Sequence, residues 1–183
     1  MKLVLTAVAL LTVASAASAK DWTLDAKASH LRFSSTQQDE PFTGEFARFT
    51  PKIAVDAAKP AEAKIDVEVD LASANTKSAE RDETLKGDDF FWTSKYPKAH
   101  FRTLSCKAGA SAGKFECDAE LTIRDKTRKL PFPFTFAESG GKATLKADVT
   151  LDRMQYGVGA SGDWGDEHTV GHQVKVSVDL TLN

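Results

Sequence analysis

Apolar and polar residues alternate with a period of two through most of the chain from residue 20 onward. This period is typical of β-strands with one dry and one wet face, and helical periodicity is almost absent. Ile65, Val67 and Val69, for example, alternate with acidic residues. The pattern predicts a mainly β domain of eight antiparallel strands, in the segments 29–34, 42–55, 65–71, 97–105, 115–123, 130–136, 145–151 and 174–180.

Eight strands are enough to close an antiparallel barrel whose interior holds side chains or one small ligand. We expect such an eight-stranded barrel, with a two-sheet sandwich as the alternative, because alternation does not show whether a sheet closes. Pro131 and Pro133 interrupt the phenylalanine-rich segment 130–136. We expect that strand to lie at an edge, at a bulge or in a loosely paired position.

The alternation stops after the third predicted strand. Ser78 is a candidate N-cap, acidic residues follow it in the first turn, and Gly87 is a natural helix end. These signals predict one short helix over 79–86, between the third and fourth strands, followed by an aromatic bend. A helix of this length needs apolar support, which we expect from the wall or mouth of the barrel.

The first nineteen residues have the composition of an export signal. Lys2 precedes the apolar run 3–13, and Ala17-Ser18-Ala19 is a small-residue cleavage site. The apolar run is shorter than the ~20 residues that span a membrane, so no integral membrane segment is expected. We therefore expect a signal peptide at 1–19, cleavage after Ala19, a β-barrel domain at 20–183 and a periplasmic location.

Charge argues against two classes of partner. The chain has 24 basic and 26 acidic residues, which gives a formal net charge of −2 at pH 7. This balance disfavours nucleic acid or an anionic membrane as the main partner. A homodimer is compatible with the sequence.

Cys106 and Cys117 flank a segment that has the composition of a hairpin tip. In an exported protein we expect these cysteines to lie opposite each other and to form a disulfide, with two free buried thiols as the alternative. Their spacing is not Cys-x-x-Cys, so a redox-active pair is not indicated.

Several short motifs, taken in order and spacing, resemble the YceI-like family of exported proteins over nearly all of the predicted domain. The resemblance implies a lipocalin-like barrel with an elongated apolar interior, which binds polyisoprenoid or other long-chain amphipathic lipids in the periplasm and is linked to isoprenoid quinones in some relatives. It brings no catalytic residue and no cofactor besides the lipid ligand. The motifs are Asp25, Ser29-x-Leu31-x-Phe33, Gly44-x-Phe46-x-x-Phe49, Arg81-Asp82 with Leu85, Asp89-Phe90-Phe91, Tyr96-Pro97, Phe101, Leu121-Thr122-Ile123, Arg153, Tyr156-Gly157-Val158 and Val170-Gly171.

Eleven phenylalanines spread over nearly every strand are the physical argument for a lipid carrier. They can surround a hollow or pack into a solid core, and the sequence leaves both open. For a hollow, we expect the lining and gate to be Phe33, Phe46, Phe49, Leu85, Phe90, Phe91, Trp92, Phe101, Phe132, Phe134, Phe136 and Tyr156. The polar residues that we expect near a lipid head group are Arg32, Arg102 and Arg153, with Asp152 and Tyr156 beside them.

A metal site, an enzyme and a protein scaffold are the rival interpretations. His168 and His172 have a spacing seen in zinc ligands, with Asp163, Asp166 and Glu167 nearby. That spacing brings two imidazoles together only on a helix, and the residues between them favour helix poorly, so we expect a solvated loop without metal. The chain contains no Gly-x-Ser-x-Gly elbow and no phosphate loop, so we expect no enzyme.

Overall fold

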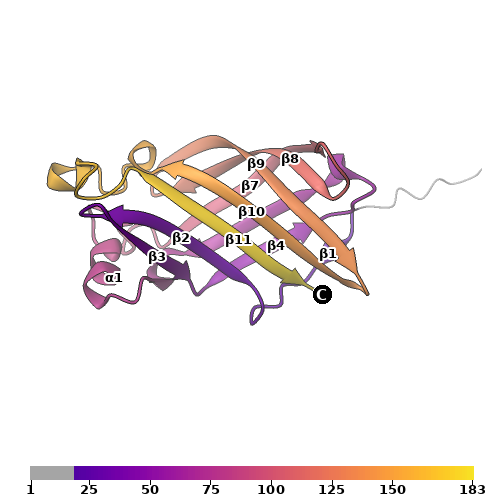
Figure 1. The fold of residues 1–183 in the computed structure, drawn as a ribbon, viewed down its shortest axis with the longest axis horizontal. Coiled ribbons are helices and arrows are strands. Elements are labelled where there is room, and N and C mark those ends of the chain that lie inside the picture. The colour runs from indigo at the N-terminus through magenta and orange to yellow at the C-terminus, as the bar shows by residue number, and fades with distance from the viewer. Residues whose placement is uncertain (1–18) are drawn as a thin grey trace, which may run out of the picture.

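Eleven strands form one antiparallel sheet in the computed structural model, which describes residues 19–183 (Figure 1). The mainly β prediction is confirmed, and the single sheet excludes a two-sheet sandwich. The predicted signal peptide, apart from Ala19, lies outside the described residues. The strands are β1 (Asp21–Trp22), β2 (His30–Gln37), β3 (Glu40–Phe46), β4 (Phe49–Ala54), β5 (Lys64–Asp70), β6 (Ala74–Asn75), β7 (Lys98–Ala108), β8 (Lys114–Ile123), β9 (Lys126–Ser139), β10 (Lys142–Asp152) and β11 (Gln173–Leu182).

The chain bends between β3 and β4, so that these two strands form one continuous, bent segment. Because of this bend, the sheet curls around one interior. Phe33 of β2 pairs with Gly44 of β3, and Ile65 of β5 pairs with Ile53 of β4. The pairings run from β4 through β5, β7, β8, β9, β10 and β11 to β2, and so return to β3. At the end of β11, the Thr23 N–H donates to the Asn183 carbonyl (3.0 Å), and the Asn183 N–H donates back (2.8 Å). The N-terminal segment therefore links β11 to β4, with which β1 pairs.

The prediction of eight strands was wrong in number, although every predicted segment is a strand or a pair of strands. The segment 42–55, taken as one strand, is divided between β3 and β4 at Ala47 and Arg48. The other two additions, β1 and β6, are two residues long each. Strands this short leave no measurable alternation in a sequence.

The strand that contains two prolines is loosely paired on one side. β9 pairs with β8 over its first ten residues, but it pairs with β10 only through 135–139. Pro131 and Pro133 therefore lie where β9 has separated from β10, and their missing N–H groups cost no hydrogen bond to that strand.

The predicted helix is confirmed as α1 (Ala79–Lys86), which lies between β6 and β7 at one end of the sheet (Figure 1). The Ser78 hydroxyl accepts from the Arg81 N–H (3.4 Å), and the Gly87 N–H donates to the Thr84 carbonyl (3.1 Å). Leu85 is the buried residue that anchors this helix. Four 3₁₀ helices complete the structure: η1 (Pro60–Glu62), η2 (Leu71–Ser73), η3 (Arg153–Tyr156) and η4 (Gly162–Gly165). Over residues 19–183, no helix combines the length and apolarity that crossing a membrane requires.

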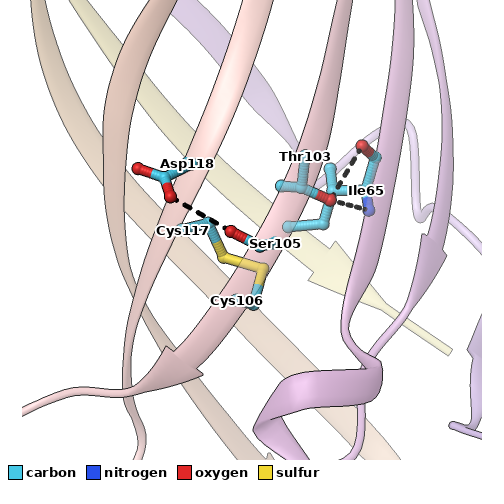
Figure 2. The surroundings of a disulfide bond; sticks show 6 residues. All are labelled: Ile65, Thr103, Ser105, Cys106, Cys117 and Asp118. Atoms are coloured by element: carbon cyan, nitrogen blue, oxygen red, sulfur yellow. Dashed lines mark hydrogen bonds between the residues drawn. A yellow bond between two sulfur atoms is a disulfide. The ribbon is translucent and has the colours of Figure 1, made fainter.

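The predicted disulfide between Cys106 and Cys117 is confirmed, and it joins β7 to β8 (Figure 2). An extra residue in β7, Leu104, shifts the register between Thr103 and Ser105. This bulge leaves Leu104 exposed and turns Cys106 toward the interior, where Cys117 faces it. Without the bulge, strict alternation would put Cys106 on the outer face.

The interior holds two apolar clusters at opposite ends. The cluster near the disulfide is filled with rings: Phe115 stacks on Phe134 with centroids 4.6 Å apart, and Trp22 meets Phe136 edge to face at 5.6 Å. The cluster near α1 includes Phe33, Leu85, Phe90, Tyr156 and Val170. Aromatic side chains therefore close one end of the interior.

Candidate functional site

A cavity of about 490 Å³ lies inside the sheet, between the filled aromatic cluster and α1. Such a volume is typical of sites that bind small organic ligands. Its walls come from β2, β3, β4, β5, β7, β8, β9, β10 and β11, and α1 lies at one end. Most of the lining is aliphatic or aromatic, so the cavity offers an apolar chain a place away from water.

Nine of the twelve apolar residues that the sequence indicated line this cavity. Phe33 comes from β2 and Phe46 from β3, and their rings lie 5.0 Å apart. Leu85 of α1 and Tyr156 of η3 are both buried there, and burial raises the pKa of the Tyr156 hydroxyl, which stays protonated. The nine residues are Phe33, Phe46, Phe49, Leu85, Phe90, Phe91, Phe101, Phe132 and Tyr156.

The other three apolar candidates lie elsewhere. Phe134 and Phe136 belong to the ring stack that fills the disulfide end. Trp92 adopts a positive φ of 50° in the bend after α1 and packs against Tyr96, with the Lys95 ammonium 4.3 Å from its ring centroid. The sequence left open two alternatives, a solid phenylalanine core and a hollow. The structure has both, at the two ends of one interior.

Two aromatic residues of the cavity were missed by the sequence analysis. Phe42 shares a face of β3 with Phe46, so its alternation could have identified it. Trp164 lies in η4, and its ring meets Phe90 at 5.3 Å. No periodicity surrounds Trp164, so the sequence carried no signal for its position.

Arg153, a predicted head-group residue, lines the cavity but has no free donor. Its Nε donates to the Gly171 carbonyl (3.0 Å), and Nη2 donates to the carbonyls of Trp164 and Val170 (2.6 Å each). Nη1 donates to the carbonyls of Val158 (2.8 Å) and Gly159. These bonds use all five N–H groups of a guanidinium. Burial lowers the Arg153 pKa, and the side chain serves to hold the loop between η3 and β11.

The other polar candidates lie away from the cavity. Arg32 has its Nε 3.5 Å from a Glu45 carboxylate oxygen, and the Arg102 Nε donates to Glu120 at 2.6 Å; both arginine side chains are exposed. Asp152 accepts from the Met154 N–H (2.9 Å) and caps η3.

Arg81, which the sequence analysis used only as part of a motif, does line the cavity. It projects from the first turn of α1, and its Nε donates to the Gln37 side-chain carbonyl oxygen at 2.8 Å. Its guanidinium carbon lies 4.3 Å from the centroid of the Phe42 ring. Sequence alone gave no signal for this role, because it depends on how α1 meets the β2–β3 hairpin.

The histidines of the predicted solvated loop face different partners. His168 Nδ1 lies 3.2 Å from a carboxylate oxygen of Asp39, and His172 Nε2 lies 2.9 Å from the Gly165 carbonyl oxygen. In the described part of the chain, no three His, Cys, Asp or Glu side chains form a group that could hold a metal ion.

A second hollow, of about 570 Å³, lies beside the bend between β3 and β4. Although it is larger in volume, its rim is charged, and those charges are already paired. Arg48 pairs with Asp70 at 2.9 Å, and Lys98 pairs with Glu68. The apolar cavity is therefore the better candidate for a ligand site.

Known proteins share both the sequence pattern and the fold. The sequence model of the YceI-like domain matches residues 22–182. A UPF0312 protein of Shewanella denitrificans is 36% identical over 123 residues, which cover 66% of this chain and 64% of the relative. A UPF0312 protein of Pseudomonas fluorescens is 33% identical over 144 residues, which cover 73% of this chain and 70% of the relative.

Two solved structures extend the comparison. Burkholderia cenocepacia BcnA superposes with a TM-score of 0.82 at 27% identity, over 87% of this chain and 99% of BcnA. A polyisoprenoid binding domain from Saccharophagus degradans, implicated in plant cell wall breakdown, gives a TM-score of 0.71 at 18% identity, over 88% and 97% of the two chains. The second likeness shows the fold. With a family match over nearly the whole described domain, the chain belongs to the YceI-like family.

Proposed function

We propose that this protein is a periplasmic carrier that binds one long apolar chain, a polyisoprenoid or another amphipathic lipid, and releases it unchanged. The observation that carries the proposal is the apolar cavity of about 490 Å³, enclosed by the sheet and closed at one end by stacked rings. The Saccharophagus degradans structure of the same fold is described as a polyisoprenoid binding domain, which supports this class of ligand. The export signal expected at 1–19 supports the location.

The size of the hydrophobic effect indicates how such a cavity would treat its ligand. Burying one five-carbon isoprene unit contributes roughly 4 kcal/mol, at about 0.8 kcal/mol per carbon. Eight units would sum to roughly 30 kcal/mol, above the ceiling of about 18–21 kcal/mol for non-covalent binding. Three to five buried units therefore suffice for tight binding after ordering costs. We propose that chain length is tolerated and that isoprenoid quinones are among the ligands that fit.

Two consecutive residues of β10 provide a matched test of this proposal. Val149 lines the cavity, whereas Thr150 is exposed on the opposite face. Val149→Trp adds an indole inside the cavity, and Thr150→Trp adds the same group outside. Titration calorimetry with geranylgeraniol, a C20 isoprenoid alcohol, measures binding to each variant.

We expect the wild-type protein and Thr150→Trp to bind geranylgeraniol with similar affinity, and Val149→Trp to bind at least about tenfold more weakly because the chain and the indole compete for space. Thermal unfolding of both variants controls for folding. Absence of binding by the wild-type protein, or equal binding by folded Val149→Trp, would contradict a ligand inside the cavity.

A further inference from the structure

The end of the cavity nearest α1 contains one arginine whose position is fixed but whose charge is not neutralised. Arg81 lies between Gln37, which accepts its Nε–H at 2.8 Å, and Phe42, whose ring centroid is 4.3 Å from the guanidinium carbon. Gln37 and Phe42 line the cavity together with Arg81. A hydrogen bond and a cation–π contact of this kind restrict where a guanidinium can lie.

The two terminal nitrogens of Arg81 remain available. Across residues 19–183, neither Nη1 nor Nη2 has a hydrogen-bond partner, and no carboxylate forms an ion pair with this side chain. Its neighbour Glu80 also lines the cavity but forms no ion pair with Arg81. Asp82 is turned away, because its carboxylate accepts from the Thr76 N–H (2.8 Å) and hydroxyl (2.7 Å). Arg153, the other arginine of the cavity, has all its donors occupied.

A guanidinium with two free terminal NH₂ groups matches the geometry of a carboxylate or a phosphate, which accepts two parallel hydrogen bonds. Beside apolar walls, the attraction between opposite charges is stronger than in bulk water. We propose that Arg81 binds the head group of the ligand and selects apolar chains that end in an oxyanion over uncharged chains of equal length. This inference rests on the proposed function and adds the class of head group.

The same geometry orients the ligand. With the oxyanion at Arg81, the apolar chain extends past Phe46 and Phe101 toward Phe132. Beyond that point Phe134 and Phe115 fill the interior. The head group thus lies at the α1 end, and the stacked rings set the depth that the chain reaches.

Calorimetric titration with three C20 isoprenoids tests the selection. Geranylgeraniol is uncharged, geranylgeranoic acid ends in a carboxylate, and geranylgeranyl monophosphate ends in a phosphate. We expect the wild-type protein to bind both anions about ten- to a hundredfold more tightly than the alcohol, with the preference declining as salt is raised. The more tightly bound anion identifies which oxyanion the site prefers.

Variants of Arg81 test whether this residue causes the preference for anions. Arg81→Gln should lower the affinity for both anions to that for the alcohol, and should change the affinity for the alcohol by no more than about twofold. Arg81→Lys should keep only part of the preference for anions, because a lysine keeps the charge but cannot donate two parallel hydrogen bonds as a guanidinium does. The control is Arg102→Gln, which removes an exposed arginine paired with Glu120 and should change none of the three affinities. Thermal unfolding shows whether each variant folds.

Gln37→Leu provides a second route if Arg81→Gln does not fold. It keeps the charge but removes the bond that fixes Nε, so the ratio of anion to alcohol affinity should fall below that of the wild type. Equal affinity of the wild-type protein for the three lipids, or an unchanged preference in folded Arg81→Gln, would overturn the inference. Failure of all three lipids to bind the wild-type protein would instead contradict the proposed lipid carrier.

Discussion

The ring of Phe33 on β2 lies against the backbone of Gly44 on β3, so close that a β-carbon at position 44 would come within 2.3 Å of its Cζ atom. Gly44 is buried and pairs directly with Phe33 in the sheet. The missing side chain at Gly44 therefore makes room for a ring of the cavity wall. The ring also meets Phe46 at 5.0 Å, so its position is shared with the next aromatic residue of β3.

Replacement of Gly44 by alanine should displace the Phe33 ring and destabilise the protein by about 1–3 kcal/mol, the usual cost of overpacking a core. Chemical denaturation measures the free energy of unfolding. Thr43→Ala, at an exposed position of the same strand, should stay within about 0.5 kcal/mol of wild type. An unchanged stability of Gly44→Ala would show that the ring can move without cost.

Arg153 should contribute more to stability than any exposed arginine. Arg153→Met removes the donors of five backbone carbonyl bonds in a buried site, and we expect a loss of about 3–5 kcal/mol in the free energy of unfolding. Arg102→Gln, on the outer face, should cost no more than about 1 kcal/mol. Similar losses for the two variants would mean that the loop between η3 and β11 does not depend on this side chain.

The disulfide stabilises the end of the interior that holds the ring stack. A cross-link between Cys106 and Cys117 closes a short loop, so Cys106→Ala combined with Cys117→Ala should reduce stability by about 3 kcal/mol. Urea unfolding with and without a reducing agent checks this, because the reductant should shift the wild-type midpoint and not that of the variant. A variant with the wild-type midpoint would exclude a stabilising role for the bond.

The pKa of His168 should lie above that of an ordinary histidine. Its hydrogen bond with Asp39 raises the His168 pKa, and Asp166 and Glu167 add to the effect. A raised pKa in the folded state means that the stabilisation is complete below about pH 6.5, the unperturbed value, and is lost as the pH rises through the folded-state value. Asp39→Asn should lower the His168 midpoint in an NMR titration, whereas Asp118→Asn at the disulfide end should not. Identical midpoints in Asp39→Asn and wild type would contradict the pairing.

Alternation predicted the strands well because it reports which face of a strand is dry. The capping signals at Ser78 and Gly87 likewise placed α1, because they act within a few residues. Neither kind of signal reports the position of a residue along the axis of the interior. Phe132 and Phe136 have the same parity on β9, yet only Phe132 lines the cavity, because register and strand tilt set the depth of each ring.

Polar roles were harder to predict than apolar ones. The composition suggested three arginines for the head group. Two of them, Arg32 and Arg102, form ion pairs on the outer face of the sheet. The donors of the third, Arg153, are occupied by carbonyls of a loop. Arg81 is placed at the cavity by a contact between α1 and β2, whose residues are 44 positions apart. Such contacts depend on tertiary packing, so a local pattern does not show them.

We propose that the hollow between α1 and the stacked rings holds a lipid chain. The most direct test is organic extraction and mass spectrometry of the protein as purified from its host, with Val149→Trp and Thr150→Trp prepared in parallel. We expect about one prenyl or acyl species per chain from the wild-type protein and from Thr150→Trp, and little or none from Val149→Trp. Clean extracts from all three proteins, or equal lipid in folded Val149→Trp, would contradict the claim.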